Sequence, residues 1–391
     1  MLKIIKVKSL FGLYSYELNL ENTEASLIKF ITGPNGYGKT TILEFIYSLY
    51  KGNLKMFSDI PFERLDFVFD NETVSIEQKK EYREQENSDE KEQTVTLCIE
   101  LRKLTDNHLI QRYEANGSDI EDGMELGLFS RTLDLYFKAQ PVYFIKDQRL
   151  WQTRGAEKNE SNVRSNADHL KKILEEEELN FGWVYNRKFS EYSKELVGIS
   201  EELYNTGKGD IETVLGVLKS YGIQLPVTLP EYQQEMAIYQ GTMLKALKDT
   251  ISERQDFINR VNALSEIITR SQFAHKLFQI DKRYGYRFVI DDELNTILNL
   301  DALSSGEKHI LLQTYELLFG AEDGALVLID EPEMSFHLMW QVDYLKNIES
   351  ISKLRNLQCV ICTHSPQIFN RNWDLTIDLY EQAQVAQKKS V

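Results

Sequence analysis

The chain has 391 residues, 42% hydrophobic and 27% charged, which is typical of a globular protein with one elaborated domain or two. Its 45 basic and 61 acidic residues give a net charge of −16, which argues against non-specific coating of nucleic acid but leaves a local basic groove possible. No apolar run approaches the roughly 18 residues of a membrane helix, and residues 1–7 alternate like a strand rather than a signal peptide, so we expect a cytoplasmic protein without membrane contact.

The 3 cysteines are too few for a disulfide framework. Cys359 and Cys362 are spaced C-x-x-C within the apolar run 357–362. On a strand, residues three apart point to opposite faces, so we expect a buried structural pair rather than a redox or metal site. The 6 histidines show no spacing typical of metal ligands.

The N-terminal part of the chain has a pattern typical of antiparallel strands. Residues 3–20 alternate apolar and polar side chains around Gly12, which predicts a hairpin. Further strand-like runs follow at 65–69, 73–76, 94–101 and 108–113. The intervening segment 77–93 has almost no apolar residue and predicts either a solvated hairpin tip or a disordered segment.

A glycine-rich segment, Gly33-Pro34-Asn35-Gly36-Tyr37-Gly38-Lys39-Thr40, follows the apolar run 27–31. The pattern G-x-x-x-x-G-K-[ST] is typical of a phosphate-binding loop: its backbone N–H groups surround phosphate oxygens, its lysine reaches the β- and γ-phosphates and its hydroxyl can bind Mg²⁺. The apolar residues that follow have helical spacing, as the motif requires: Ile42, Phe45, Ile46 and Leu49. The segment predicts a site for ATP and Mg²⁺. Its candidate residues are Asn35, Gly36, Gly38, Lys39, Thr40 and Thr41.

The middle of the chain changes character after the short apolar run 141–145. Glycines become sparse and helical patterns dominate, most clearly at 167–179, 189–203 and 232–273. We therefore divide the chain into an N-terminal lobe, a helical or coiled-coil insertion and a C-terminal lobe, with bounds 1–152, 153–283 and 284–391.

Strands and helices alternate in the last part of the chain. Strand patterns lie at 286–290, 325–329 and 357–362, with helical patterns at 306–319 and 338–348. Such alternation implies a largely parallel sheet that binds ligands at the carboxyl ends of its strands. The expected fold class is α/β, a mixed sheet with a flanking antiparallel sheet and a helical insertion.

Two further motifs suit a nucleotide site. Asp330 follows an apolar strand and can hold the Mg²⁺ shell, and Glu331 beside it can polarise an attacking water. A simple acidic turn before Pro332 is the alternative. The segment 303–308 (LSSGEK) offers hydroxyls, a glycine and the free N–H groups of a helix N-terminus to an anion, although a serine N-cap would look similar.

The order of these motifs resembles that of the ABC-type ATPases. Ser304-Ser305-Gly306-Glu307 is similar to their signature motif, with Ser305 in place of the first glycine and Glu307 in place of glutamine. Both departures are similar to those of the SMC, RecF and OLD-type branch. The resemblance implies an ABC-type P-loop ATPase head in which Gln148 senses Mg²⁺ and the attacking water.

The same resemblance assigns 334–337 to the D-loop and makes His364 the switch histidine for the γ-phosphate; a histidine that packs in the core or caps a turn is the alternative. It implies a homodimer, or a higher homo-oligomer, in which the signature segment of one subunit completes the nucleotide site of another. The implied site residues group by role: catalytic Glu331, His364 and Gln148; signature Ser304, Ser305, Gly306 and Glu307; metal Thr40, Gln148 and Asp330.

Residues 10–14, 33–40 and 144–149 resemble bacterial OLD-like ATPases of antiphage defence, such as the ATPase components of the Septu and PARIS systems. This resemblance implies an ATPase that acts as a sensor or scaffold and controls a separate effector, a nuclease or toxin. A DNA-binding repair ATPase similar to RecF is the alternative, and it predicts ATP-dependent, salt-sensitive DNA binding. A transporter ATPase is a third possibility, which the helical insertion and the Ser-Ser-Gly-Glu signature disfavour.

Overall fold

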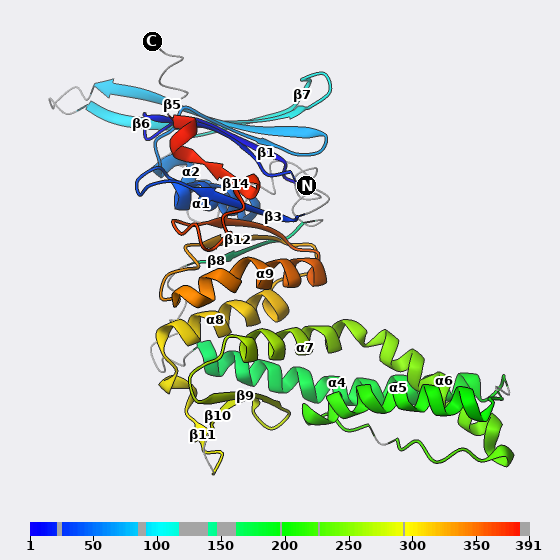
Figure 1. Cartoon of the computed structure of the whole chain (residues 1–391). Coiled ribbons are helices and arrows are strands. Elements are labelled where there is room, and N and C mark those ends of the chain that lie inside the picture. Colours follow the sequence, from blue (N-terminus) through cyan, green and yellow to red (C-terminus); the bar gives the residue numbers. More distant parts are fainter. Residues whose placement is uncertain are drawn as a thin grey trace. The chain divides into compact units, whose positions relative to one another are not determined.

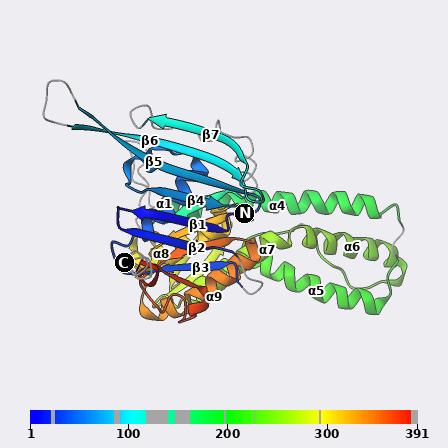
Figure 2. The same cartoon turned by 90° about the horizontal axis from the view of Figure 1, so that it is seen from above.

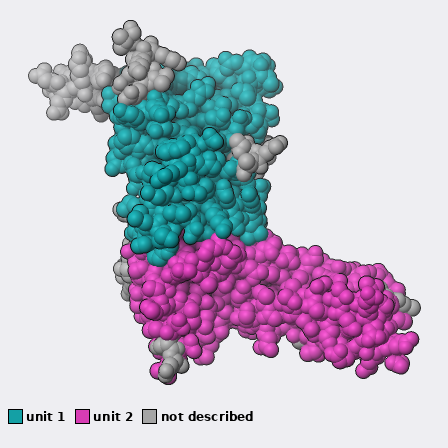
Figure 3. Space-filling model, in the orientation of Figure 1, with its two compact units in different colours: residues 1–148, 321–391 teal, residues 149–320 magenta. Residues whose placement is uncertain are grey.

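The computed structural model describes residues 1–21, 26–84, 91–116, 140–146, 162–195, 198–225, 227–291 and 294–383 (Figure 1). Contacts divide the chain into two compact units, coloured separately in Figure 3. The first unit comprises residues 1–148 and 321–391, and the second comprises residues 149–320. Within the described ranges, no helix is both long and apolar enough to cross a membrane.

A five-stranded parallel sheet, in the order β14-β3-β13-β12-β8, forms the centre of the first unit. Its strands are β3 (Ile28–Thr32), β8 (Val142–Ile145), β12 (Leu326–Asp330), β13 (Gln358–Cys362) and β14 (Thr376–Asp378). Every residue of β12 and β13 is buried, as expected for a parallel sheet covered on both faces. Figure 1 shows the helices α1 (Lys39–Lys51) and α9 (Leu338–Arg355) on opposite sides of this sheet.

A six-stranded antiparallel sheet, in the order β2-β1-β4-β5-β6-β7, lies in the same unit. Its strands are β1 (Ile4–Leu10), β2 (Tyr14–Asn19), β4 (Arg64–Val68), β5 (Glu72–Glu84), β6 (Lys91–Lys103) and β7 (Leu109–Asn116). The predicted hairpin and the four predicted strands are confirmed. β5 and β6 are longer than predicted, 13 residues each, because a main-chain ladder forms without apolar side chains. Residues 85–90, the rest of the predicted tip, lie outside the described residues.

The C-terminal segment meets the outer edge of β2, seen in Figure 2. Gln382 Nε2 donates to the Glu17 carbonyl oxygen at 2.9 Å, and the Glu17 N–H donates to Gln382 Oε1 at 2.8 Å. One side-chain amide therefore makes the pair of hydrogen bonds that a residue of a neighbouring strand would make.

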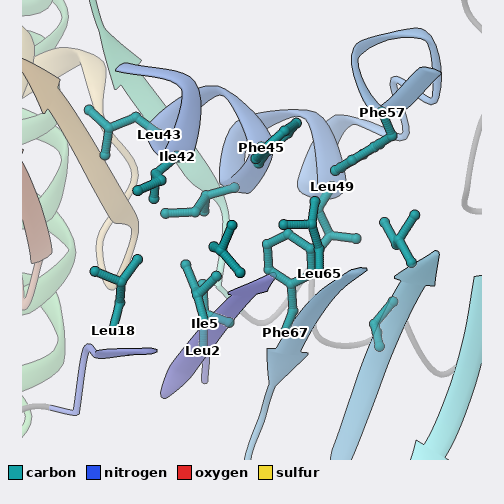
Figure 4. Packing of buried hydrophobic residues seen from close by; sticks show 14 of the residues in the cluster. Leu2, Ile5, Leu18, Ile42, Leu43, Phe45, Leu49, Phe57, Leu65 and Phe67 are labelled. Carbon is teal, nitrogen blue, oxygen red and sulfur yellow. The ribbon is translucent and has the colours of Figure 1, made fainter. Parts of the chain in front are cut away.

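The helix α1 packs between the two sheets. Its residues Ile42, Phe45, Ile46 and Leu49 are at most 1% exposed, which confirms the predicted apolar face. Figure 4 shows Phe45 and Leu49 close to Leu65 and Phe67 of the antiparallel sheet. Since burial of an apolar side chain of this size contributes about 1.5–3 kcal/mol, this core fixes the position of the glycine-rich loop before α1.

Within the described residues, the second unit begins with the helices α4 (Asn162–Tyr192), α5 (Glu201–Ser220), α6 (Ala237–Glu253) and α7 (Gln255–Arg270). It also contains a three-stranded antiparallel sheet of β9 (Lys276–Asp281), β10 (Gly285–Ile290) and β11 (Ile297–Leu298). The last helix, α8 (Ser305–Tyr315), continues into a π-helical turn, Glu316–Gly320. The parallel sheet, the antiparallel sheet and the helical region confirm the predicted α/β class.

Two helical predictions need correction. The predicted helix 189–203 is wrong, because α4 ends at Tyr192 and α5 begins after Ser200, whose Oγ accepts the Leu203 N–H at 3.4 Å. A serine at this position favours an N-cap over a helix interior. The predicted helix 232–273 divides at Arg254 into α6 and α7. The strand β9 was not predicted.

The two compact units do not coincide with the three regions that the motifs predict. Residues 284–320, which the motifs assign to a C-terminal lobe, pack within the second unit, where β10 and α8 both contact α4. The assignment of 284–391 to one lobe remains a prediction.

Candidate nucleotide-binding site

Three adjacent strands of the parallel sheet end at one edge of the first unit. β13 lies between β3 and β12, and both neighbours pair with it in parallel. Their carboxyl ends therefore lie together, as do the segments that follow: the loop 33–38, the residues after Asp330 and the turn after Cys362. The topology thus brings the predicted phosphate loop, acidic pair and histidine to one place.

The loop before α1 depends on glycine at two positions. Gly36 and Gly38 have φ angles of 85° and 86°, in the left-handed region that glycine adopts without strain. A Cβ atom on Gly38 would lie 2.6 Å from Leu10 Cδ2, at the end of β1. The helix α1 has no side-chain N-cap among the described residues, so its first N–H groups remain available to an anion.

Lys39 lies folded over this loop. The residue is 5% exposed, and its Nζ donates to the carbonyl oxygens of Gly33 and Pro34 at 3.0 and 3.3 Å. Burial lowers the pKa of Lys39, and the nearby thiol of Cys362 and carboxylates of Glu331 and Asp330 oppose that shift. The ammonium therefore lies in a partly desolvated position where a negatively charged phosphate would stabilise it.

Thr40 and Asp330 form the second part of the arrangement. Thr40 Oγ1 donates to Asp330 Oδ2 at 2.9 Å, which joins the first turn of α1 to the end of β12. Both are oxygen donors of the kind that Mg²⁺ prefers. Among the residues that the structure describes, no group of three or more His, Cys, Asp or Glu side chains could hold a metal ion. The pair therefore fits an ion that takes its other ligands from phosphate or water.

Glu331 and His364 come together beside Lys39. Glu331 has φ 45°, and its N–H donates to the Cys362 carbonyl oxygen at 2.9 Å, one residue beyond the end of β12. His364 Nε2 lies 3.1 Å from Glu331 Oε1 and 2.7 Å from Lys39 Nζ. The two contacts require opposite protonation of Nε2, since an ammonium needs an acceptor and a carboxylate needs a donor. Nε2 can serve one of them at a time.

Glu333 was missed by the sequence analysis. Its Oε1 accepts hydrogen bonds from Thr363 Oγ1 at 2.7 Å, His364 N at 2.7 Å and Ser365 N at 3.2 Å. A third acidic residue after the pair Asp330-Glu331, just beyond Pro332, was the available signal. Its partners lie about 30 residues further along the chain, and no short pattern shows that distance.

A cluster of tyrosines beside the loop was also missed. Tyr37, within the loop, stacks on Tyr14 with ring centroids 5.0 Å apart and lies 5.8 Å from Tyr380. Tyr16 Oη donates to the Tyr37 carbonyl oxygen at 2.9 Å. These contacts hold the apex of the loop against β2 and the segment after β14.

The signature segment belongs to the second unit, at the start of α8. Ser304 Oγ accepts the Glu307 N–H at 3.3 Å, and Glu307 Oε2 accepts the Ser304 N–H at 2.7 Å, so the two residues form a capping box. Lys276 Nζ also donates to both Glu307 oxygens, at 2.6 and 2.8 Å. Burial opposes ionisation of Glu307, but the Lys276 ammonium and the Ser304 N–H outweigh it and lower the pKa of Glu307.

The remaining predicted site residues differ in whether the structure describes them and in how exposed they are. Gln148 lies outside the described residues. Asn35, Ser304 and Ser305 are exposed, Thr41 is half-buried and Gly306 is buried. All of their roles in nucleotide binding remain predictions. The cysteines agree with the sequence analysis: Cys359 and Cys362 are free and buried, and burial raises the pKa of Cys359 to about 12.

A glycine loop with a buried lysine, before a helix at the carboxyl edge of a parallel sheet, defines a P-loop nucleotide-binding protein. The model of the AAA ATPase domain family matches residues 1–369, and the chain belongs to this family. No curated protein matches the chain.

Two solved structures resemble the chain with low TM-scores. One is the Smc head bound to the C-winged helix domain of ScpA, with 12% identity, 94% of this chain and 91% of that chain covered and a TM-score of 0.41. The other is the Smc head domain with an extended coiled coil, bound to the C-terminal domain of ScpA and derived from Pyrococcus furiosus, with 14% identity, 100% and 99% covered and a TM-score of 0.40. The family assignment rests on the family match.

Proposed function

We propose that the chain binds ATP with Mg²⁺ and hydrolyses it to ADP and phosphate. The observation that carries this proposal is that His364 Nε2 lies 2.7 Å from Lys39 Nζ and 3.1 Å from Glu331 Oε1. Both contacts lie at the carboxyl edge of the parallel sheet, beside the hydrogen bond between Thr40 and Asp330. Thr40 and Asp330 would hold the Mg²⁺. The ion would neutralise charge on the phosphate oxygens.

The contacts of His364 support a specific order of events. With Lys39 as an ammonium near His364, Nε2 acts as its acceptor. When Lys39 Nζ binds the β- and γ-phosphates instead, Nε2 loses this contact, and the imidazole tautomer with its proton on Nε2 can donate a hydrogen bond to Glu331 or to the γ-phosphate. Glu331 then orients the attacking water and accepts its proton as the bond to the γ-phosphorus forms and the bond to the leaving ADP oxygen breaks.

Phosphate release and ATP affinity test this proposal on three variants. Lys39→Ala should weaken ATP binding at least about tenfold, since it removes a charged hydrogen bond. Glu331→Gln should bind ATP as the wild type does but hydrolyse it about 100-fold or more slowly, because the amide cannot accept the proton. Asp343→Ala, an exposed change on α9, should match the wild type. Equal turnover by Glu331→Gln and wild type would remove Glu331 from the mechanism.

We also propose that two or more copies assemble around ATP, with the signature segment of one subunit at the nucleotide of another. This proposal rests on the resemblance to ABC-type ATPases and on the exposed Ser304 and Ser305 at a helix N-terminus. Light scattering of Glu331→Gln should show a monomer without nucleotide and at least a dimer with ATP and Mg²⁺. A species whose mass does not change with ATP would contradict ATP-dependent assembly.

The biological role that we propose is control of a separate effector, a nuclease or toxin, in bacterial antiphage defence. It rests on the resemblance of residues 10–14, 33–40 and 144–149 to OLD-like ATPases. Native mass spectrometry of tagged Glu331→Gln, purified with ATP from its own host, should find an effector in fixed ratio. An ATP-dependent dimer that carries DNA and no second protein would instead favour the RecF-like repair role.

A further inference from the structure

The segments on either side of the Glu331–His364 contact are joined by a second set of hydrogen bonds. The turn 363–365 donates three of these to one oxygen of Glu333, from a hydroxyl and two backbone N–H groups. The other oxygen, Glu333 Oε2, is buried without a hydrogen-bond partner among the described residues. One carboxylate oxygen therefore accepts all three of these hydrogen bonds.

The backbone explains why Glu333 faces this turn. The positive φ of Glu331 turns the chain away from the direction of β12, and Pro332 then fixes the next φ angle. These two residues bring Glu333 alongside the first residues after β13. A second link lies close by: Ser365 Oγ is 2.6 Å from Gln341 Oε1, on the buried side of α9. The turn is thus held at Thr363, His364 and Ser365.

Charge makes the Glu333 contact strong. A carboxylate that accepts backbone N–H groups forms charge-assisted hydrogen bonds, which are about twice as strong as neutral ones. The His364 backbone N–H is one of these donors, and its side chain is the one that meets both Lys39 and Glu331. The backbone of His364 is therefore fixed from one side while its imidazole reaches the candidate reaction centre on the other.

We infer that Glu333 is a positioning residue that holds His364 in place for ATP hydrolysis. The inference rests on the proposed function, since His364 needs a reaction to serve. Among the described residues Glu333 makes no hydrogen bond with Lys39 or Thr40, and its charge is the weakest of those that oppose the lowered pKa of Lys39, so ATP binding should depend on it little. Hydrolysis should depend on it strongly, because a displacement of about 1 Å at a reacting group can slow a reaction about 100-fold.

Kinetics separate positioning from general damage. Glu333→Ala should lower kcat at least about tenfold and change the affinity for ATP by less than about threefold. Glu333→Gln keeps a side-chain oxygen that can accept the same N–H groups, and it should restore kcat to within about threefold of the wild type. In a His364→Ala background, Glu333→Ala should have no further effect on kcat, since the two residues act as one unit. An equal loss in both backgrounds would overturn the positioning role.

Hydrogen exchange without nucleotide gives a readout that needs no activity. In Glu333→Ala the His364 N–H should exchange at least about tenfold faster, while Ser365, whose N–H also donates to Thr363 Oγ1 at 3.0 Å, should change less. Asp343→Ala should leave both rates unchanged. Unchanged exchange at His364 in Glu333→Ala would overturn the anchor itself. If Glu333→Ala shows this faster exchange but the wild type does not hydrolyse ATP, the proposed function and the kinetic part of this inference are overturned, while the anchor remains.

Discussion

Alanine at Gly36 and at Gly38 should destabilise the chain to different extents, although the two glycines have almost the same backbone conformation. Their φ angles are 85° and 86°, so an alanine at either position is forced into the left-handed region at a cost of about 1–2 kcal/mol. The surroundings differ. A Cβ on Gly36 meets nothing within 4 Å, whereas a Cβ on Gly38 lies 2.6 Å from Leu10 Cδ2.

The difference between the two variants isolates the steric contribution. Leu10 is fully buried, so its side chain can move aside only by disturbing the core, which typically costs about 1–3 kcal/mol. We therefore expect Gly36→Ala to lower the free energy of unfolding by about 1 kcal/mol, after the smaller entropy of the unfolded alanine chain is counted. Gly38→Ala should lower it by about 2–4 kcal/mol.

Urea unfolding without nucleotide, followed by circular dichroism, measures both losses, provided that the slope of free energy against urea concentration is unchanged. Leu10→Ala removes the atom that would clash, so its effect and that of Gly38→Ala should sum to more than the effect of the double variant. Equal losses for Gly36→Ala and Gly38→Ala, or strict additivity with Leu10→Ala, would refute this reasoning.

Two further predictions concern Thr40 and Cys359. Thr40→Val loses the hydroxyl that donates to Asp330 at 2.9 Å, and it should raise the Mg²⁺ concentration for half-maximal hydrolysis at least about tenfold. Thr40→Ser keeps a hydroxyl and should not raise it. An equal Mg²⁺ dependence of the wild type and both variants would contradict the proposed metal site. Burial raises the pKa of Cys359 from 9.0 to about 12, so the folded chain retains this proton above pH 9 and its stability falls as pH rises. At pH 10 the loss from this group is about 1 kcal/mol. Urea midpoints at pH 7.5 and pH 10 should therefore shift further apart in the wild type than in Cys359→Ala, and identical shifts would show that Cys359 does not titrate as expected.

The parts of the site that could be predicted are those whose residues lie close together in the sequence. The glycine loop, Lys39 and Thr40 lie within eight consecutive residues, and the helix after them has a clear apolar period. Asp330, Glu331 and His364 lie far from the loop in sequence. The apolar strand before them predicted the acidic pair, and the resemblance to ABC-type ATPases implied His364. The rule that ligands bind at the carboxyl ends of parallel strands explains why all three lie beside the loop.

Contacts that depend on side-chain direction could not be predicted. The three donors to Glu333 become visible only when the turn at Glu331 is known. The meeting of Lys39 with His364 requires the register between β3 and β13. Helix ends in the second unit were missed for a related reason, since Ser200 reads equally well as an exposed helical residue until its Oγ is seen to accept the Leu203 N–H.

The contact between Gln382 and Glu17 has a consequence for self-association in solution. The last strand of a sheet exposes unpaired N–H and carbonyl groups, which invite a strand from another molecule and so begin aggregation. At Glu17 both groups are already occupied by Gln382, and the C-terminal segment that carries it stands where an incoming strand would have to lie. Gln382 thus blocks the pairing of an incoming strand at Glu17, one position on the outer edge of β2.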